Sequence, residues 1–221
     1  IMQKRFEREA RAVSQLAHPN IVTVYDYGKT ADGALFLAME FVDGEVLRDT
    51  LKRKRALAFA ETLPIVDAIA SALARAHAAG VVHRDLKPEN VILPRQSAST
   101  TGAVVAKVLD FGLAKPHDPD AVDEHLTRDG GFVGTPGYAA PEQTEGAPES
   151  PQQDLYALGV VWFELLFGEH PFAAPTPMKT VARQLVEDPP VLDPSRADIP
   201  APAASLIRRL LARKPDDRPA S

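Results

Sequence analysis

The stretch His-Arg-Asp-Leu-Lys-Pro-Glu-Asn, residues 83–90, decides how this sequence is interpreted. It follows Gly80, a residue type that commonly ends helices, and it precedes a short apolar run over residues 91–93 that is expected to form a strand. Acidic, basic and amide side chains therefore gather on a polar loop between two regular elements. Such loops commonly carry binding and catalytic groups.

Two further motifs follow this loop at defined spacing. Asp-Phe-Gly occupies residues 110–112 at the end of a second apolar run and begins 25 residues after Asp85. Gly-Thr-Pro-Gly-Tyr-Ala-Ala-Pro-Glu occupies residues 134–142. An isolated Asp-Phe-Gly is a common surface turn, but three motifs in this order are far more specific than any one of them.

These motifs resemble those of the eukaryotic-type protein kinase family, and the resemblance extends from Arg5 to Pro219. Lys87 gives the loop its Ser/Thr kinase form, as in bacterial Ser/Thr kinases. The resemblance implies an activation segment over residues 110–142 and an α+β, two-lobe fold. The expected parts are a partial small lobe, made of a helix and two strands, and a mainly helical large lobe.

The resemblance also implies the roles of the catalytic residues. Asp85 would accept the proton of a substrate hydroxyl, and Lys87 would place its ammonium group against the γ-phosphate of ATP. Asn90 and Asp110 would hold Mg²⁺ or Mn²⁺, because hard cations prefer oxygen ligands. Asp85, Lys87 and Asn90 are therefore the predicted catalytic residues.

On the nucleotide side, the resemblance assigns ATP-binding roles to residues near the start of the chain. Glu9 is expected to pair with an ATP-anchoring lysine, and Met39 to lie at the back of the adenine pocket. The backbone of Glu40 and Val42 is expected to bind adenine. Lys87, Asn90 and Asp110 are expected to complete the ATP site.

The resemblance implies a switch in the activation segment. Arg84 is expected to be a buried cation that awaits a phosphate, and Thr127 is the predicted site of that phosphate. Thr135 is expected to reach Asp85 and Lys87 through its hydroxyl group.

Three more residues are predicted to support the site. Asp154 begins a helix, where a carboxylate can accept backbone N–H groups, and the resemblance implies that it holds the catalytic loop. Glu142 and Arg218 are expected to form a buried ion pair.

Hydrophobic periodicity gives the expected organisation of the chain. Residues 1–44 are predicted to be the partial small lobe with its hinge, and residues 45–221 the large lobe. In the first part we expect a helix from Met2 to Leu16 and strands over Ile21–Tyr27 and Leu35–Phe41. Further helices are expected over residues 63–77, 154–167 (buried on all sides), 178–187 and 203–213.

Composition excludes several classes of function. The net charge is −5, which argues against a nucleic-acid-binding surface, and the absence of cysteine excludes disulfides and thiolate chemistry. The longest apolar run, residues 155–167, is too short to span a bilayer, so no membrane segment is expected. We expect a cytoplasmic kinase domain.

The sequence departs from the family at its start, where neither a glycine-rich phosphate loop nor an ATP-anchoring lysine strand is found. Residues 1–221 alone are therefore expected not to phosphorylate anything. A partial sequence of an intact kinase and a degenerate pseudokinase are competing explanations, and the complete Asp85, Lys87, Asn90 and Asp110 set favours the first. A small-molecule phosphotransferase is a weaker alternative, because residues 134–142 resemble a segment that seats a peptide. The expected partners are proteins with Ser or Thr acceptors and a second kinase molecule for autophosphorylation.

Overall fold

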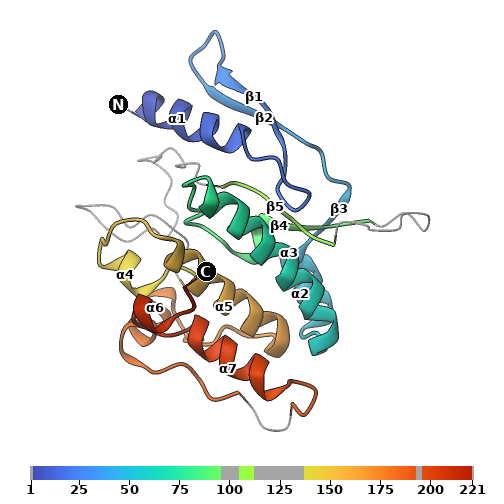
Figure 1. Cartoon of the computed structure of the whole chain (residues 1–221), viewed down its shortest axis with the longest axis vertical. Coiled ribbons are helices and arrows are strands. Elements are labelled where there is room, and N and C mark those ends of the chain that lie inside the picture. The colour runs from blue at the N-terminus through green and yellow to red at the C-terminus, as the bar shows by residue number, and fades with distance from the viewer. Residues whose placement is uncertain (1, 96–104, 112–136, 193–195, 221) are drawn as a thin grey trace.

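The structure is a computed structural model and describes residues 2–95, 105–111, 137–192 and 196–220. Figure 1 shows α1, β1 and β2 at one end of the molecule and helices α4 to α7 at the other, with a second small sheet and helices α2 and α3 between them. Among the described residues, no helix combines the length and apolar character needed to cross a bilayer. The α+β class predicted from the sequence is confirmed.

The first part of the chain contains one helix and a two-stranded antiparallel sheet. Helix α1 (Met2–Ser14) packs through buried Ala10 and Val13, and strand β1 (Val24–Lys29) pairs with β2 (Leu35–Met39). The expected strand over Ile21–Tyr27 is shifted. Its first residue instead forms a bridge with Val108, so the chain joins the second sheet before it enters β1.

The second sheet has the order β3-β4-β5, formed by β3 (Gly44–Val46), β4 (Val91–Pro94) and β5 (Lys107–Val108). Strand β3 is not predicted by the sequence, which suggests only a break at Gly44. A Cβ atom at Gly44 would lie 2.5 Å from the backbone oxygen of Leu93, so only glycine allows β3 to approach β4 this closely. The division of the chain into residues 1–44 and 45–221 stays a prediction.

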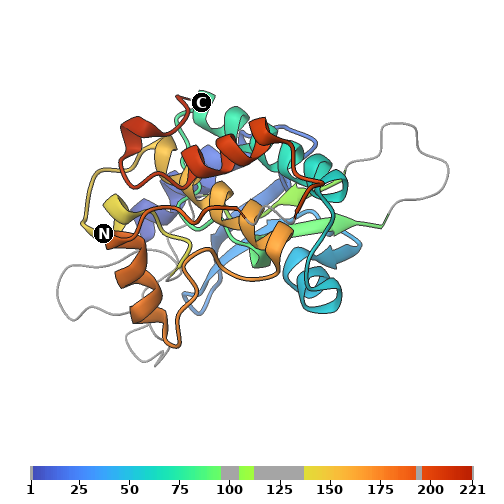
Figure 2. The ribbon, with the colours of Figure 1, turned by 90° about the horizontal axis from the view of Figure 1, so that it is seen from below.

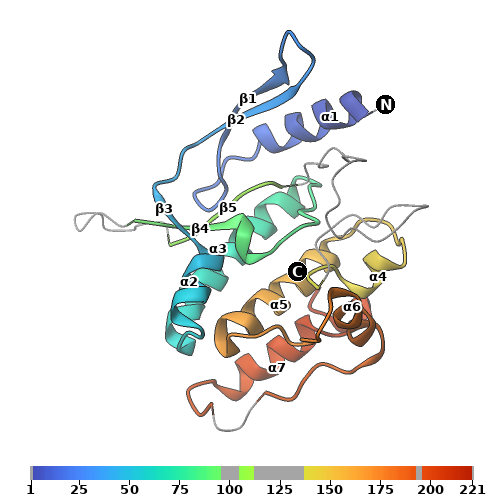
Figure 3. The same cartoon turned by 180° about the vertical axis from the view of Figure 1, so that it is seen from behind.

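The helical part is built around α5 (Pro151–Phe167), which lies between α3 (Phe59–Ala78) and α7 (Ala201–Leu210) in Figures 1 and 3. All residues from 153 to 166 are buried, so the predicted helix without an exposed face is confirmed. Gly159 permits the close contact with α7, because a Cβ atom there would lie 2.8 Å from Cβ of Leu210.

The remaining helices are short. Helix α6 (Pro177–Val186) lies to one side of α5 and α7 and runs across their direction (Figure 2). Helix α2 (Leu47–Lys54) follows β3 directly, and α4 (Pro141–Thr144) begins within the Ala-Pro-Glu motif, at its proline. The 3₁₀ turns are η1 (Pro88–Asn90), within the catalytic loop, and η2 (Pro215–Asp217).

Candidate active site

The loop that carries the predicted catalytic residues is fixed by one buried carboxylate. Asp154, in the first turn of α5, accepts hydrogen bonds from the backbone N–H groups of His83 (2.8 Å) and Arg84 (2.9 Å). Its Oδ2 atom also lies 2.7 Å from Nε2 of His77. Three polar partners satisfy this buried group, and the start of α5 therefore determines the path of the loop.

His83 connects the loop to the Asp-Phe-Gly segment. Its Nε2 atom lies 2.9 Å from the carbonyl oxygen of Leu109, and its Nδ1 atom accepts the N–H group of Asp85 (3.3 Å). The ring packs on Phe111, with centroids 4.6 Å apart. Burial lowers the pKa of His83 below its ordinary 6.5, although Asp154 acts in the opposite direction. The imidazole therefore stays neutral, as one donating and one accepting nitrogen require.

The predicted catalytic residues lie in contact with one another. Nζ of Lys87 is 3.0 Å from Oδ2 of Asp85, and Nδ2 of Asn90 donates to the carbonyl oxygen of Asp85 (2.8 Å). Both Lys87 and Asn90 are mostly buried. The loop thus presents a carboxylate and an ammonium group from two positions only two residues apart.

Asp110 is brought to the same place by the second sheet. The N–H group of Leu109 donates to the carbonyl oxygen of Asn90 (2.9 Å), so Asp110 follows directly after a residue bonded to the catalytic loop. Asp110 has φ of +56°, a left-handed conformation that non-glycine residues seldom adopt. Such strain is typical of functional positions.

Asn90 and Asp110 fit a divalent cation through their chemistry. The Nδ2 group of Asn90 is bound to Asp85, which leaves its Oδ1 atom as the metal-binding atom, and Asp110 adds a carboxylate. Mg²⁺ needs only one or two protein oxygens when phosphates complete its shell. In the described ranges no group of three or more acidic or histidine side chains could hold a metal by itself.

Comparisons with known proteins agree with this geometry. The protein kinase domain family matches residues 1–221. The chain belongs to this family. It is 44% identical over 220 residues to the serine/threonine-protein kinase pkn3 of Myxococcus xanthus, covering 98% of this chain and 40% of that protein.

Two further relatives carry similar names. The serine/threonine-protein kinase PknA of Mycobacterium tuberculosis (strain ATCC 25618 / H37Rv) is 39% identical over 216 residues, covering 96% of this chain and 47% of that protein. The serine/threonine-protein kinase Pkn1 of Myxococcus xanthus is 42% identical over 222 residues, covering 99% of this chain and 30% of that protein. The chain thus spans less than half the length of these relatives.

The structure shows partners for two charged residues of the kinase domain, Arg84 and Glu9, whose predicted roles stay predictions. Arg84 is not an unpaired cation, because Nη1 lies 3.0 Å from Oε1 of Glu9 and Nη2 contacts the carboxylate of Glu149. In the structure α1 carries Glu9 to the catalytic loop, and its expected pairing with an ATP-anchoring lysine stays a prediction. Thr127 and Thr135 lie outside the described residues, as does Gly112 of the Asp-Phe-Gly motif.

The predicted adenine-binding segment follows β2, which ends at Met39. The N–H group of Glu40 donates to the carbonyl oxygen of Thr23 (2.8 Å), so only the carbonyl group of Glu40 remains for adenine. The Glu40 side chain pairs with Lys107 (2.8 Å), a contact that lowers the pKa of Glu40 although burial alone would raise it. No backbone hydrogen bond joins Val42 to the part of the chain that is described.

A charged network that the sequence did not reveal joins α2 to the loop and to α5. Nε of Arg48 donates to Glu89 (2.7 Å), Nη1 lies 2.5 Å from Oε1 of Glu164, and Nη2 contacts the hydroxyl group of Tyr138. That hydroxyl also donates to Glu164 (2.6 Å), and burial followed by the Glu164 charge raises the pKa of Tyr138. The one feature of the sequence that could have indicated this network is Glu164, a charged residue within an otherwise apolar stretch of helix α5.

The predicted ion pair between Glu142 and Arg218 is present. Nη1 and Nη2 of Arg218 donate to the two carboxylate oxygens of Glu142 at 2.7 and 2.8 Å. This bidentate pair joins α4 to the segment that follows η2.

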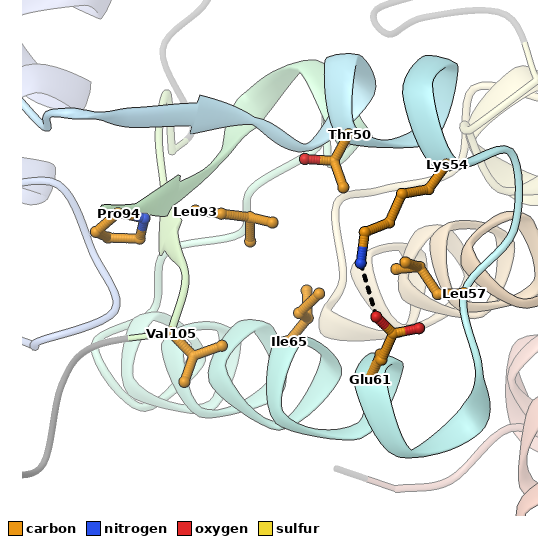
Figure 4. A pocket seen from close by; sticks show the side chains of 8 residues that line it. All are labelled: Thr50, Lys54, Leu57, Glu61, Ile65, Leu93, Pro94 and Val105. Atoms are coloured by element: carbon orange, nitrogen blue, oxygen red, sulfur yellow. Dashed lines mark hydrogen bonds and ion pairs between the residues drawn. The ribbon is translucent and has the colours of Figure 1, made fainter. Parts of the chain in front are cut away.

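A cavity of about 390 Å³ lies away from the catalytic loop, between α2, α3 and β4 (Figure 4). Lys54 and Glu61 form an ion pair of 2.7 Å at one end of it. None of the predicted ATP-binding residues lines it, and its walls are mostly aliphatic. The lining residues are Thr50, Lys54, Leu57, Glu61, Ile65, Leu93, Pro94 and Val105.

Proposed function

We propose that the intact protein transfers the γ-phosphate of ATP to Ser or Thr hydroxyl groups of proteins. The observation that carries this proposal is the mutual contact of Asp85, Lys87 and Asn90 on a loop that Asp154 fixes. Phosphoryl transfer depends mainly on positioning and on charge stabilisation, which a fixed loop of this composition can supply.

In this reaction the substrate oxygen attacks the γ-phosphorus, the bond to the ADP oxygen breaks, and the hydroxyl proton passes to the carboxylate of Asp85. Lys87 lies 3.0 Å from Asp85, so its ammonium group would lie beside the attacking oxygen when a substrate hydroxyl is bound to Asp85. There it would stabilise the negative charge that spreads over the transferred phosphoryl group.

Asn90 and Asp110 would hold Mg²⁺ or Mn²⁺ through their side-chain oxygens. When bound, the cation supplies positive charge to the β- and γ-phosphates. These two residues would position the cation, because Asn90 is bound to the catalytic loop and Asp110 directly follows a residue that is hydrogen-bonded to that loop.

The adenine ring would bind to the carbonyl group of Glu40 and to the backbone of Val42, with Met39 behind it. Protein substrates are the proposed partners, and a second kinase molecule is the proposed partner for autophosphorylation. We also propose that the domain works in the cytoplasm, where ATP is supplied.

The test is transfer of label from γ-labelled ATP by the purified intact protein, with Mg²⁺ and a protein acceptor, followed by phosphoamino acid analysis. Phosphoserine or phosphothreonine is expected, and the Lys87→Met variant should abolish the label. Binding of Mg–ATP without transfer would instead identify a pseudokinase.

A further inference from the structure

The ammonium group of Lys107 has one hydrogen-bond partner among the described residues, and that partner is Glu40 in the proposed adenine-binding segment, residues 39–42. The Nζ atom of Lys107 lies 2.8 Å from Oε2 of Glu40, and 67 residues separate the two along the chain. The exposed fraction is 14% for the Lys107 side chain and 25% for that of Glu40. Water and salt therefore screen this ion pair less than they screen the pairs on the surface.

Glu40 is held on its other side by Thr23, the residue before β1. The N–H group of Glu40 donates to the carbonyl oxygen of Thr23 (2.8 Å), and the N–H group of Thr23 donates to Oε2 of Glu40 (3.3 Å). Burial alone would raise the pKa of Glu40, but the hydrogen bonds from Lys107 and Thr23 lower it, so the carboxylate stays charged at neutral pH. Both the backbone and the side chain of Glu40 are therefore fixed.

The strand that carries Lys107 does not depend on the Lys107 side chain for its position. The N–H group of Val108 donates to the carbonyl oxygen of Asn20 (2.8 Å). The Nδ2 group of Asn20 donates to the carbonyl oxygen of Ala106 (2.9 Å). These bonds hold both neighbours of Lys107, so a change of its side chain should leave the path of the chain toward Asp110 intact.

The ion pair connects two parts of the molecule that no strand ladder joins. Glu40 follows β2, and Lys107 lies in β5, which belongs to the other sheet. Residues 20–23 lie between them, since they bond to β5 through Asn20 and to Glu40 through Thr23. The Lys107 side chain spans this segment and sets the position of Glu40 relative to the second sheet.

We propose that Lys107 is a positioning residue for the adenine-binding segment of the ATP site. It acts through Glu40, whose carbonyl group would accept a hydrogen bond from the amino group of adenine. A segment that is already ordered loses less conformational freedom when the nucleotide binds, so the ion pair should strengthen binding of the adenine end of ATP. This inference rests on the proposed kinase function and on the adenine site that belongs to it.

The test measures how the intact protein binds two parts of ATP, by isothermal titration calorimetry. Adenosine reports on the adenine-binding segment, and tripolyphosphate with Mg²⁺ reports on the metal-binding side. In Lys107→Met the Kd for adenosine should rise on the order of fivefold, because the competent arrangement of residues 39–42 becomes less populated. The Kd for Mg²⁺-tripolyphosphate should stay within about twofold of wild type, because the path of β5 toward Asp110 is unchanged.

Two further variants separate the role of the ion pair from a general effect of changing a lysine. Lys107→Arg should restore most of the adenosine affinity, because a guanidinium group also pairs with a carboxylate. Lys29→Met is the matched control, since Lys29 is an exposed lysine at the end of β1, and it should bind both ligands as wild type does.

Glu40→Gln gives a second measurement on the other partner of the ion pair. This variant removes the charge that Lys107 binds but keeps the N–H bond to Thr23, so it should weaken adenosine binding by a similar factor. The double variant with Lys107→Met should bind adenosine no more weakly than either single variant, because both changes remove the same interaction.

Three results would overturn the proposal: wild-type adenosine affinity in Lys107→Met, equal losses of affinity for adenosine and Mg²⁺-tripolyphosphate, or additive losses in the double variant. Absence of adenosine binding by the wild type would overturn it as well. If the wild type binds both ligands but transfers no phosphate, the proposed function fails while the binding data still decide the role of Lys107.

Discussion

Arg218 and Arg84 are both arginines among acidic partners, but they are held in different ways. Arg218 has a fully buried side chain, binds both oxygens of Glu142, and donates further to the carbonyl groups of Ala212, Gln152 and Arg213. Arg84 makes single contacts to Glu9 and Glu149, and its Nε atom has no partner among the described residues. All three guanidinium nitrogens of Arg218 have hydrogen-bond partners, which indicates a structural anchor. Arg84, beside Asp85, has a nitrogen without a partner among the described residues, which indicates a group whose partners can change.

The largest effect on stability should come from the anchor. Arg218→Met should lower the free energy of unfolding by about 3–5 kcal/mol, because it leaves the mostly buried Glu142 carboxylate without its partner. Denaturant unfolding of the intact protein measures this change. Arg213→Met is the control, since among the described residues the Arg213 side chain forms only an exposed ion pair, with Asp188, and the stability of this variant should hardly differ from that of wild type. If Arg218→Met lowers the free energy of unfolding no more than Arg213→Met does, Arg218 is not a structural anchor.

A fall in pH should lower the stability of the protein through His83 of the catalytic loop. Burial lowers the pKa of His83 from 6.5, so below pH 6.5 the unfolded chain binds a proton that the folded chain does not. The free energy of unfolding therefore decreases as the pH falls below 6.5. Burial also lowers the pKa of His170, so this residue should change the stability in the same direction.

Unfolding free energies between pH 7 and pH 5 measure this effect. His83→Gln can still donate to Leu109, and it should flatten the pH dependence even if it lowers stability at pH 7. A variant with the wild-type slope would mean that His83 does not titrate as its burial requires.

Arg84 should contribute less to stability than Arg218. Arg84→Met should lower the free energy of unfolding by less than Arg218→Met, because Arg84 makes one contact with each of two carboxylates, whereas Arg218 also binds three backbone carbonyl groups, and because Asp154 and Gln143 still hold the backbone of the loop. The comparison uses the same denaturant titration as for Arg218. A loss equal to that of Arg218→Met would remove the distinction between the two arginines.

Local sequence was sufficient to predict the centre of the site. Asp85, Lys87 and Asn90 lie within one short loop, so their proximity follows from the motif itself, and the buried helix α5 follows from its unbroken apolar pattern. The Glu142–Arg218 pair was found only because the family resemblance supplied it, since 76 residues separate the two.

Side-chain pairs between distant segments could not be predicted. Arg84 meets Glu9 across 75 residues, and Arg48 meets Glu164 across 116 residues. Hydrophobic periodicity reports which face of a helix is buried but not which charges face each other there. Strand β3 was missed for a related reason, since three residues give too short a pattern to recognise.

The central claim is that Asp85 is the proton acceptor of a phosphoryl-transfer site, and the most direct test is the Asp85→Asn variant of the intact protein. Its kcat should fall by about 10²–10⁴-fold, because the amide cannot accept the hydroxyl proton. Its affinity for Mg–ATP should stay nearly unchanged, because Asn90 and Asp110 are the proposed metal ligands. Undiminished turnover in Asp85→Asn would contradict the account.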